Sequence, residues 1–390
     1  MKGEIAIVRT SSEVPAAYIM NLLVSYLMPG MKLSRPVYGQ KGQMLINRGV
    51  ELTPRYIEAL QEHGVLAVAV ESICDLDSQR AETALEESVL VRAAASFQNW
   101  IERNNDQSEI AEIVASVNSI VDETLSGKVP LARLAEISAA DIYTFTHSID
   151  VCAFSVYIGL KHGYKKDTLL DLGIGSILHD LGKVRLSPEV LNKPAKLTED
   201  EFAEVKKHPL WGYTMLKESV SSQISDRALA IVLGHHERCD GSGYPRGIKA
   251  DEIDDLTSIC ALADIYCAMT TERVYRDAFP PNEVYEMLMA SGDRDIKYDL
   301  ISLFSRCVCP FPAETLVRLN NGKVGCVTAN NQNLPFRPVV TMIGTREEID
   351  LSKELYLVVD RVLTQKEMQD VIMGARSETT APSPLFRKTN

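Results

Sequence analysis

The 390-residue chain lacks a long uninterrupted apolar run. Its longest apolar stretch, residues 14–31, is broken by two prolines and by polar side chains. A membrane-spanning helix needs about 20 predominantly apolar residues in a row. The acidic Glu4 and the lack of a clean cleavage site also argue against a signal peptide. We therefore expect no membrane span and a cytoplasmic location.

The chain also lacks an excess of basic side chains. It carries 41 lysines and arginines against 53 aspartates and glutamates, which gives a formal net charge of -12. General binders of nucleic acids or membrane surfaces need a basic face, so we expect no DNA or RNA partner. An anionic small substrate stays open, because local charge decides its binding.

The eight cysteines lack the spacing of a disulfide framework or a zinc site. Cys307 and Cys309 form a lone C-x-C, which is a weak metal signal. Free cysteines most often behave as small buried hydrophobic residues, and the reducing cytosol keeps them unpaired. We expect that role for most of them here.

Changes of pattern along the chain divide it into parts. Short β-like runs with glycine turns, and then a helix with Thr53 as N-cap and Pro54 in its first turn, indicate a small α/β module. After Pro312, β-runs around Asn320-Asn321-Gly322 predict a hairpin. The pattern between them is helical, so the fold class is mainly α. The predicted parts are an α/β module at 1–76, a helical linker at 77–124, a helical bundle at 125–310, a β segment at 311–365 and a disordered tail at 366–390.

Residues 77–138 carry apolar side chains at three- and four-residue steps, which predicts amphipathic helices. Such helices serve as linkers, form homodimer contacts, or pack onto the next domain. The pattern alone does not choose among these roles.

Histidine is scarce, yet six of the seven histidines fall between positions 147 and 236, and five of these form a spaced series. Two aspartates, Asp180 and Asp264, extend the series, whose members recur about every 30 residues, the length of one or two helices with a connection. Helical bundles build two-metal sites from inward-facing side chains in this way. His63 and His162 lie outside the series, and we expect them to be ordinary core residues. The predicted ligands are His147, His179, Asp180, His208, His235, His236 and Asp264.

Imidazole nitrogens and carboxylate oxygens suit iron, manganese, cobalt, nickel or zinc. Seven ligands exceed the needs of one ion, whereas two ions sharing a carboxylate use them all. Two metals activate a water and stabilise in-line displacement at phosphorus. Lys183, Arg273 and Arg276 follow the ligands closely and offer charge-assisted hydrogen bonds to phosphate.

The motifs resemble those of the HD-GYP family of the HD phosphohydrolase superfamily. The resemblance covers roughly residues 125 to 310. It rests on His147-Ser148, "HDLGK" at 179–183, "LNKPAKLTEDEFAEVKKHPLWG" at 191–212, "HHERCDGSGYPRG" at 235–247, and Asp264 with "ERVYR".

The resemblance implies an HD-type helical bundle that hydrolyses cyclic di-GMP to pGpG and, in some members, on to GMP. It implies two or three divalent metals, commonly iron or manganese. The seven residues above would be the ligands, with Asp180 as the bridge. Lys183, Tyr244 and Arg273 would contact the dinucleotide, and we add Gly243, Pro245 and Arg276 to the expected substrate-binding residues. Lys183 would also stabilise charge in the reaction.

Three positions depart from the family pattern. Trinuclear members carry a glutamate one helical turn before the first histidine, and here that residue is Tyr143, which predicts two metals. Cys267 stands where an aspartate is frequent, which weakens the expected support of the ligands. Val274 replaces a proline, a change that we expect to be mild.

Two other functions stay open from the sequence. One is an HD hydrolase of another cyclic nucleotide, since the metal ligands are common to all of them. The other is a catalytically silent module that senses cyclic di-GMP or binds a protein partner.

Overall fold

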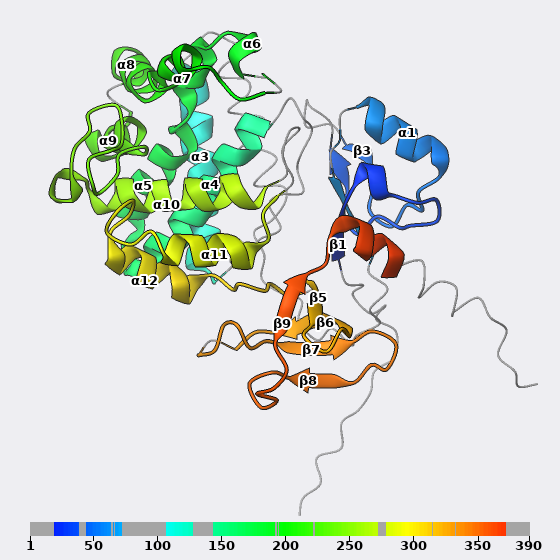
Figure 1. Ribbon diagram of the computed structural model, residues 1–390. Coiled ribbons are helices and arrows are strands. Elements are labelled where there is room, and N and C mark those ends of the chain that lie inside the picture. Colours follow the sequence, from blue (N-terminus) through cyan, green and yellow to red (C-terminus); the bar gives the residue numbers. More distant parts are fainter. Residues whose placement is uncertain are drawn as a thin grey trace, which may run out of the picture.

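Figure 1 shows a computed structural model of the chain, in which a helical domain, an N-terminal module and a C-terminal sheet form three parts. The fold class predicted from the sequence, mainly α with a small α/β module and a β segment, is confirmed. The structure describes residues 19–38, 44–63, 65, 67–71, 107–127, 143–191, 193, 195–220, 223–271, 278–313, 315–331 and 333–371.

The helical domain holds the candidate site. Two short 3-10 helices, η3 (Leu181–Arg185) and η4 (Ala250–Glu252), join its longer elements. The α-helices are α3 (Gln107–Leu125), α4 (Tyr143–His162), α5 (Lys166–Leu178), α6 (Pro188–Leu191), α7 (Glu199–Val205), α8 (His208–Val220), α9 (Asp226–Gly234), α10 (Asp255–Thr270), α11 (Pro281–Met289) and α12 (Tyr298–Cys307).

Helix α4 lies between two hydrophobic cores of this domain. Ile149, Cys152 and Val156 pack with α3, α5, α8 and α9. Val151 and Phe154 pack on the other side with α10, α11 and α12. A helix that is apolar all round must be buried on all sides, and α4 meets that need by separating the two cores. His147 is thereby carried into the interior on a rigid element.

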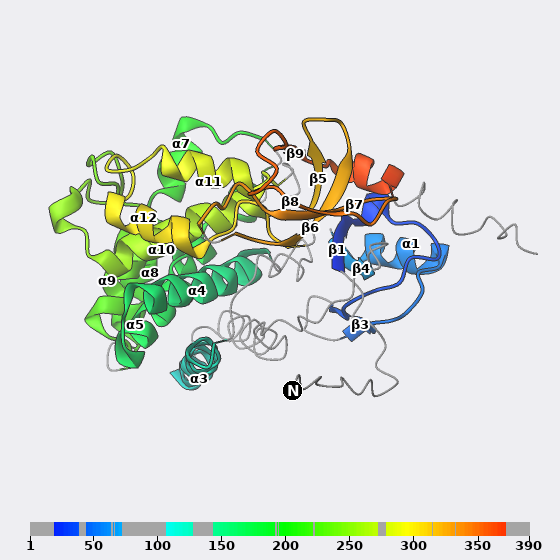
Figure 2. The same ribbon diagram turned by 90° about the horizontal axis from the view of Figure 1, so that it is seen from below.

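Helix α3 packs into the first of these cores. Ile110, Ile113 and Val117 are fully buried at helical spacing, and each large apolar side chain buried in this way contributes about 1.5–3 kcal/mol. A Cβ on Gly173 of α5 would lie 2.6 Å from Val117 Cγ1, so the missing side chain lets the two helices approach. Figure 2 shows α3 along the edge of the bundle, beside α5.

The sequence analysis placed residues 77–124 in a linker and left packing onto the next domain open. For α3 the structure favours packing, and we propose that the helical domain begins at Gln107. Residues 72–106 lie outside the described part of the chain, so a homodimer contact through them stays a prediction.

The N-terminal module contains two antiparallel strand pairs and one helix. β1 (Ile19–Leu23) pairs with β4 (Ala67–Glu71), and β2 (Val37–Tyr38) pairs with β3 (Met44–Ile46). The predicted start of helix α1 (Pro54–Glu62) is confirmed. Thr53 is its N-cap, with Oγ1 accepting a hydrogen bond from the Tyr56 amide at 3.3 Å, and Pro54 occupies the first turn. A 3-10 turn, η1 (Val24–Tyr26), follows β1.

The C-terminal part is a five-stranded antiparallel sheet in the order β8-β7-β6-β5-β9. The predicted hairpin joins β5 to β6, and Gly322 adopts a φ of 81° in its turn, a conformation that favours glycine. The strands are β5 (Leu316–Leu319), β6 (Val324–Ala329), β7 (Val339–Met342), β8 (Glu348–Asp350) and β9 (Val359–Val362).

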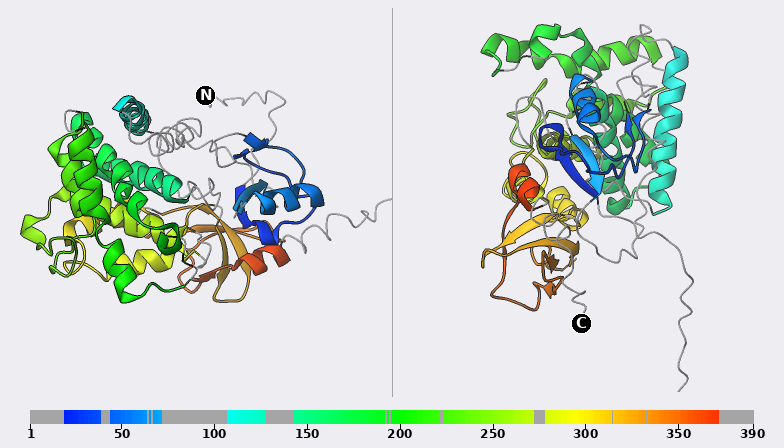
Figure 3. Two further views of the ribbon diagram at one scale, coloured as in Figure 1. Left: turned by 90° about the horizontal axis from the view of Figure 1, so that it is seen from above. Right: turned by 90° about the vertical axis from the view of Figure 1, so that its right-hand side faces the viewer.

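The two ends of the chain share one hydrophobic core. Leu316, Cys326 and Leu363 of the C-terminal part pack in one cluster with Leu22, Val70 and other residues of the N-terminal module. Figure 3 shows the last described helix beside the N-terminal module. The amide of Leu23 donates to Gln365 Oε1 at 3.4 Å, and Gln369 Nε2 donates to the carbonyl of Tyr26 at 3.3 Å.

The prediction of a disordered tail from residue 366 is wrong for its first six residues. Residues 365–371 are helical, and Met368 and Val371 pack against the shared core. The contact with a distant module, which no local pattern announces, orders this stretch. Residues 372–390 lie outside the described part of the chain. None of the described helices combines the length and apolar content that a membrane crossing requires.

Candidate metal centre

The structure brings all seven predicted ligands together at the centre of the helical domain. Their ligand atoms fall into two adjoining groups, and within each group they lie within 4.8 Å of one another. One group contains Asp180, His208, His235 and His236, and the other contains His147, His179 and Asp264. Helices α4 and α10 and the ends or starts of α5, α8 and α9 supply these residues.

A close backbone contact sets the distance between Asp180 and His208. Helix α5 ends at Leu178, and the chain turns through His179 and Asp180 into η3. Gly182 of η3 lies against the start of α8, where an added Cβ would be 2.0 Å from the carbonyl oxygen of His208. It would also be 2.7 Å from the amide nitrogen of Gly212. The glycine therefore lets the two ligand-bearing elements touch.

Three of the histidines are oriented in the same way. Nδ1 of His179, His208 and His235 lies 2.7, 2.7 and 2.9 Å from the carbonyl oxygen three residues earlier. A carbonyl only accepts, so each Nδ1 carries the hydrogen and each Nε2 keeps a free lone pair. Hydrogen bonding at the second ring nitrogen is the usual way in which proteins orient a metal-binding histidine.

The free nitrogens point at the carboxylate of Asp180. Nε2 of His179 lies 3.3 Å from Asp180 Oδ2, while Nε2 of His208 and His235 lie 3.3 and 3.9 Å from Oδ1. The two carboxylate oxygens thus face different histidines. In the second group, His147 Nε2 lies 2.9 Å from Asp264 Oδ1, and His179 Nε2 lies 3.8 Å from the same oxygen.

Two features of this cluster fit bound cations. Nε2 of His208 and of His235 are 3.2 Å apart, so two lone pairs face each other unless a cation lies nearby. Asp180 Oδ1 and His179 Nε2 are buried without a hydrogen-bond partner, an arrangement that is costly in an interior. The histidine and aspartate cluster is therefore able to hold metal ions.

Burial favours the neutral, metal-binding form of three of the histidines, while neighbouring carboxylates act against it at a fourth. Burial lowers the pKa of His147, places that of His235 well below its usual value, and brings that of His236 to about 3. Burial also acts to lower the pKa of His179, but the carboxylates of Asp180 and Asp264 outweigh it and raise that pKa.

Burial alone would raise the pKa of both carboxyl groups. For Asp180, the neighbouring His179 and Lys183 outweigh burial and hold the pKa well below its usual range. For Asp264, the hydrogen bond from His147 and the charges of the surrounding histidines lower it. Ionised carboxylates beside neutral imidazoles are the ligand forms that bind metal.

A cavity of about 360 Å³ opens onto the cluster. Its volume falls within the range typical of ligand pockets. The side chains around it come from α7, from the end of α9 and the loop after it, from α10, and from the segment before α12. They are Phe202, His235, His236, Glu237, Arg238, Tyr244, Ala261, Asp264, Ile265, Ala268, Met269, Asp295 and Ile296.

The predicted substrate-binding residues lie in different places. Tyr244 lines the cavity, with its ring centroid 4.7 Å from that of His236. Lys183 Nζ lies 2.5 Å from Asp180 Oδ2. Gly243 and Pro245 are not among the described residues that line the cavity. Arg273 and Arg276 lie outside the described part of the chain.

The glycines in the loop that follows the double histidine allow this loop to adopt its conformation. A Cβ on Gly243 would lie 2.4 Å from the amide nitrogen of Arg238 and 2.5 Å from Cα of Glu237. Gly241 adopts a φ of 82°, which favours glycine. The sequence analysis had placed Gly243 among the expected substrate-binding residues. In the structure Gly243 instead lets the loop fold back onto the backbone that follows the double histidine.

Four other positions were singled out from the sequence. Cys267 of α10 is buried in the second core, and burial raises the pKa of its thiol. Tyr143 is the first residue of α4, and its side chain lies outside the described part. His63 and His162 are exposed, so the expectation that they are core residues is wrong.

Glu237 is a functional residue that the sequence analysis missed. Its side chain is fully buried, and its carboxylate accepts hydrogen bonds from the amides of Arg246 and Ile248 at 2.8 and 3.2 Å. These contacts fasten the far end of the loop that carries Tyr244. The sequence does show an acid directly after the double histidine. The hydrogen-bond partners of this acid lie nine and eleven residues further along the chain, so the pattern did not reveal its role.

Replacing Glu237 with glutamine is expected to lower the free energy of unfolding by about 1–3 kcal/mol, because the new amide group cannot accept from both backbone donors. Urea unfolding of both proteins measures the change. Glu252→Gln, at an exposed position of η4, is the matched control. Equal stability of the two variants would show that the buried carboxylate does not hold the loop.

The fold and the cluster define a helical domain with a site able to hold metal ions, and comparison with known proteins identifies its family. Residues 108–300 match the HD domain, and residues 316–371 match the KOW domain associated with the HD domain. The helical domain therefore belongs to the HD-domain family.

Several curated relatives match the chain over about half of its length or more. A cyclic di-GMP phosphodiesterase of Pseudomonas aeruginosa is 30% identical over 62% of this chain and 59% of its own. The response regulator RpfG of Xanthomonas campestris, also a cyclic di-GMP phosphodiesterase, is 36% identical over 47% of each chain. A 3'3'-cGAMP-specific phosphodiesterase of Vibrio cholerae is 31% identical over 48% of this chain and 36% of its own.

Among solved structures, an HDG"Y"P protein from Bdellovibrio bacteriovorus covers 73% of this chain and 98% of its own, with 16% identity and a TM-score of 0.49. The chain thus spans about half the length of the curated relatives that it matches.

Proposed function

We propose that the protein is a metal-dependent phosphodiesterase that hydrolyses cyclic di-GMP to pGpG and, in a second step, to GMP. The observation that carries this proposal is the pair of adjoining histidine and aspartate groups, three of whose members line a cavity of ligand size. The relatives named as cyclic di-GMP phosphodiesterases support the choice of substrate. The reaction would belong to bacterial second-messenger signalling.

We assign the two groups to two divalent ions, iron or manganese, with Asp180 as the bridging ligand. The placement of its two oxygens toward different histidines supports the bridge. When bound, such ions supply the Lewis acidity that activates a water molecule and stabilises charge on a phosphate. His235, His236 and Asp264 line the cavity and would hold the ions next to the space that the substrate enters.

The protein's own cations and rings would then bind and orient the dinucleotide. The Lys183 ammonium, 27% exposed beside Asp180, is placed to balance negative charge that develops on the phosphate. Tyr244 offers a ring and a hydroxyl at the cavity wall. Arg273 and Arg276 are proposed as phosphate contacts on the family resemblance.

Removal of the metals is expected to abolish turnover. Protein stripped with a chelator should cleave no cyclic di-GMP, and Mn²⁺ or Fe²⁺ restored under anaerobic conditions should return pGpG, measured by chromatography. The metal content is measured in parallel, so that protein without bound metal is distinguished from metal-loaded protein that is inactive. A fully loaded protein that forms no pGpG contradicts the proposed function.

A second substrate deserves the same assay, because relatives from Vibrio cholerae are specific for 3'3'-cGAMP. The metal ligands do not distinguish two cyclic dinucleotides. Rates on both compounds, compared on one loaded preparation, decide between them.

The catalytically silent sensor is the remaining alternative. The presence of all seven candidate ligands in two compact groups argues against it, because loss of ligands is expected of a module that only senses. An Asp180→Ala variant that keeps the cellular phenotype would favour the silent module.

We also propose a cytoplasmic location. Seven cysteines in the described part of the chain are free thiols, as expected in a reducing compartment.

A further inference from the structure

An exposed aromatic side chain lies at the wall of the metal-site cavity. Phe202 of α7 lines the cavity together with His235 and His236, yet 45% of its surface is exposed. The sequence analysis gave it no role, and it is not among the described residues that pack in the two cores of the helical domain. An apolar ring at the mouth of a polar site loses exposed surface when a flat ligand covers it.

The short helix that carries Phe202 is held firmly at its start. Thr198 and Glu201 form a capping box, in which each side chain bonds the backbone amide of the other. Lys193 Nζ adds a salt bridge to Glu201 at 2.6 Å. These contacts fix the backbone at the start of α7 and thereby hold Phe202 at the cavity.

A lysine connects Phe202 to the metal centre through aromatic rings. Nζ of Lys206, one turn after Phe202, lies 4.7 Å from the Phe202 ring centroid and 5.8 Å from that of Tyr244. Tyr244 in turn lies against His236. Lys206 is exposed and forms no ion pair with a carboxylate of the described residues, which leaves its charge available to an anion.

We infer that Phe202 and Lys206 form a nucleobase-binding subsite beside the metal centre. This inference rests on the proposed function and assigns two residues that determine its substrate specificity. In the inferred complex a purine base stacks on the Phe202 ring, and the ammonium of Lys206 turns from the ring to a phosphate oxygen. Stacking of a base on an aromatic ring is stronger than an exposed cation–π contact, so the exchange is favourable.

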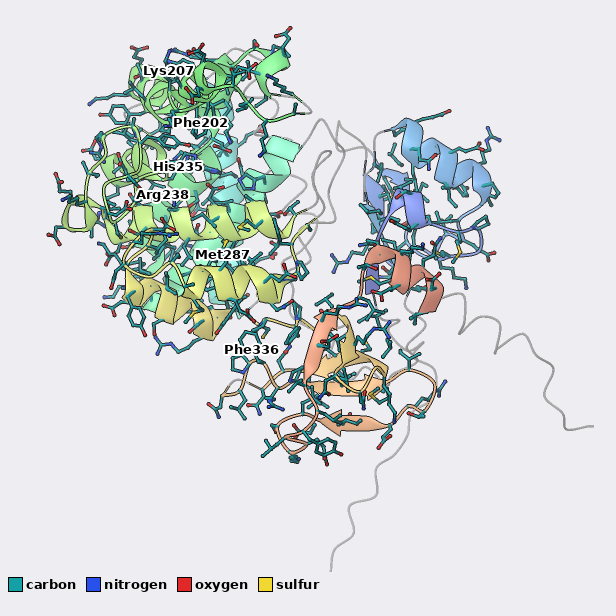
Figure 4. The ribbon with its side chains drawn as sticks, in the orientation of Figure 1. Phe202, Lys207, His235, Arg238, Met287 and Phe336 are labelled. Carbon is teal, nitrogen blue, oxygen red and sulfur yellow. The ribbon has the colours of Figure 1, made fainter. Side chains whose placement is uncertain are left out.

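The residues that line the cavity agree with a substrate that has a base on each side of the scissile phosphate. Figure 4 shows Phe202 and Arg238 on opposite sides of His235 in that view, and all three residues line the cavity. A phosphate held at the floor would therefore direct one base toward α7. The other base would extend toward Arg238, which forms a salt bridge with Asp295 at 2.5 Å.

The variant Phe202→Ala is expected to raise KM for the cleaved cyclic dinucleotide about 5- to 50-fold with little change in kcat. Lys206→Ala should raise KM by a smaller factor. Phe202→Tyr keeps the ring and should restore KM, which a merely structural loss would not predict. Lys217→Ala is the matched control, because Lys217 lies 5.3 Å from the Tyr213 ring on α8, away from the cavity lining.

A binding measurement separates this inference from the proposed function. In Phe202→Trp, a stacked guanine quenches the new indole, so titration of metal-loaded protein with cyclic di-GMP should lower its fluorescence. Quenching without turnover would leave the subsite standing and contradict the phosphodiesterase. An unchanged KM in Phe202→Ala on the dinucleotide that is cleaved, or no quenching by cyclic di-GMP or 3'3'-cGAMP, overturns the inference.

Discussion

Asp180→Asn is expected to reduce kcat for cyclic di-GMP by about a thousandfold or more and to lower the metal content of the protein. The reason is the central place of this carboxylate. Its two oxygens lie 3.3 Å from Nε2 of His208, in its own ligand group, and from Nε2 of His179, in the other group. An amide has no charge and binds divalent ions poorly.

Asparagine is preferable to alanine because it keeps the volume of the buried side chain. Its amide group can also donate to one of the free imidazole nitrogens, so the metal-free fold should persist. Metal content by mass spectrometry and the melting temperature with and without chelator measure the two effects separately. Asp171→Asn, on the preceding helix α5 and outside the cluster, is the matched control. Full metal content and full rate in Asp180→Asn would exclude a bridging role.

Gly182→Ala is expected to lower the free energy of unfolding by about 3 kcal/mol and to weaken metal binding together with it. The added methyl group would lie 2.0 Å from the carbonyl oxygen of His208 and 2.7 Å from the amide nitrogen of Gly212. Both contacts are with backbone, which no side-chain rotation relieves. Relief requires α8 to move away from η3, and His208 then moves away from Asp180.

The matched control for this prediction is Gly292→Ala. There the nearest atom is Tyr298 Cδ2 at 3.2 Å, and this exposed side chain can shift. Denaturant unfolding gives the stability of each variant, and metal titration gives the affinity. Similar losses in the two variants would show that the contact between η3 and α8 does not control the distance between the ligands.

Much of the fold and of the candidate centre could be predicted because their signals are local. Thr53 and Pro54 mark the start of α1, and Asn320-Asn321-Gly322 marks the turn between β5 and β6. The recurrence of histidines and acids at helical intervals indicated convergence in a bundle, and the structure places the seven side chains in two adjoining groups. Their role as ligands stays a proposal until metal is measured.

The features that escaped prediction depend on contacts between distant segments. Glu237 has partners beyond the loop that follows it, and the exposure of Phe202 depends on where α7 lies relative to the double histidine. The helical pattern of α3 was visible, but not that its apolar face fits against Gly173. Spacing along the chain describes one element at a time, whereas these roles arise between elements.

The two ends of the chain pack in one core, so the helical domain is an insertion between the two halves of a single unit. Leu22 and Leu363 belong to one cluster, although more than 300 residues separate them along the chain. The unit formed by the two ends is thus connected to the helical domain twice, by the chain before α3 and by the chain after α12. A third tie is the 5.4 Å ring contact between Tyr285 of α11 and Phe336. A force applied to either terminus therefore acts on the shared core before it reaches the helical domain through these three connections.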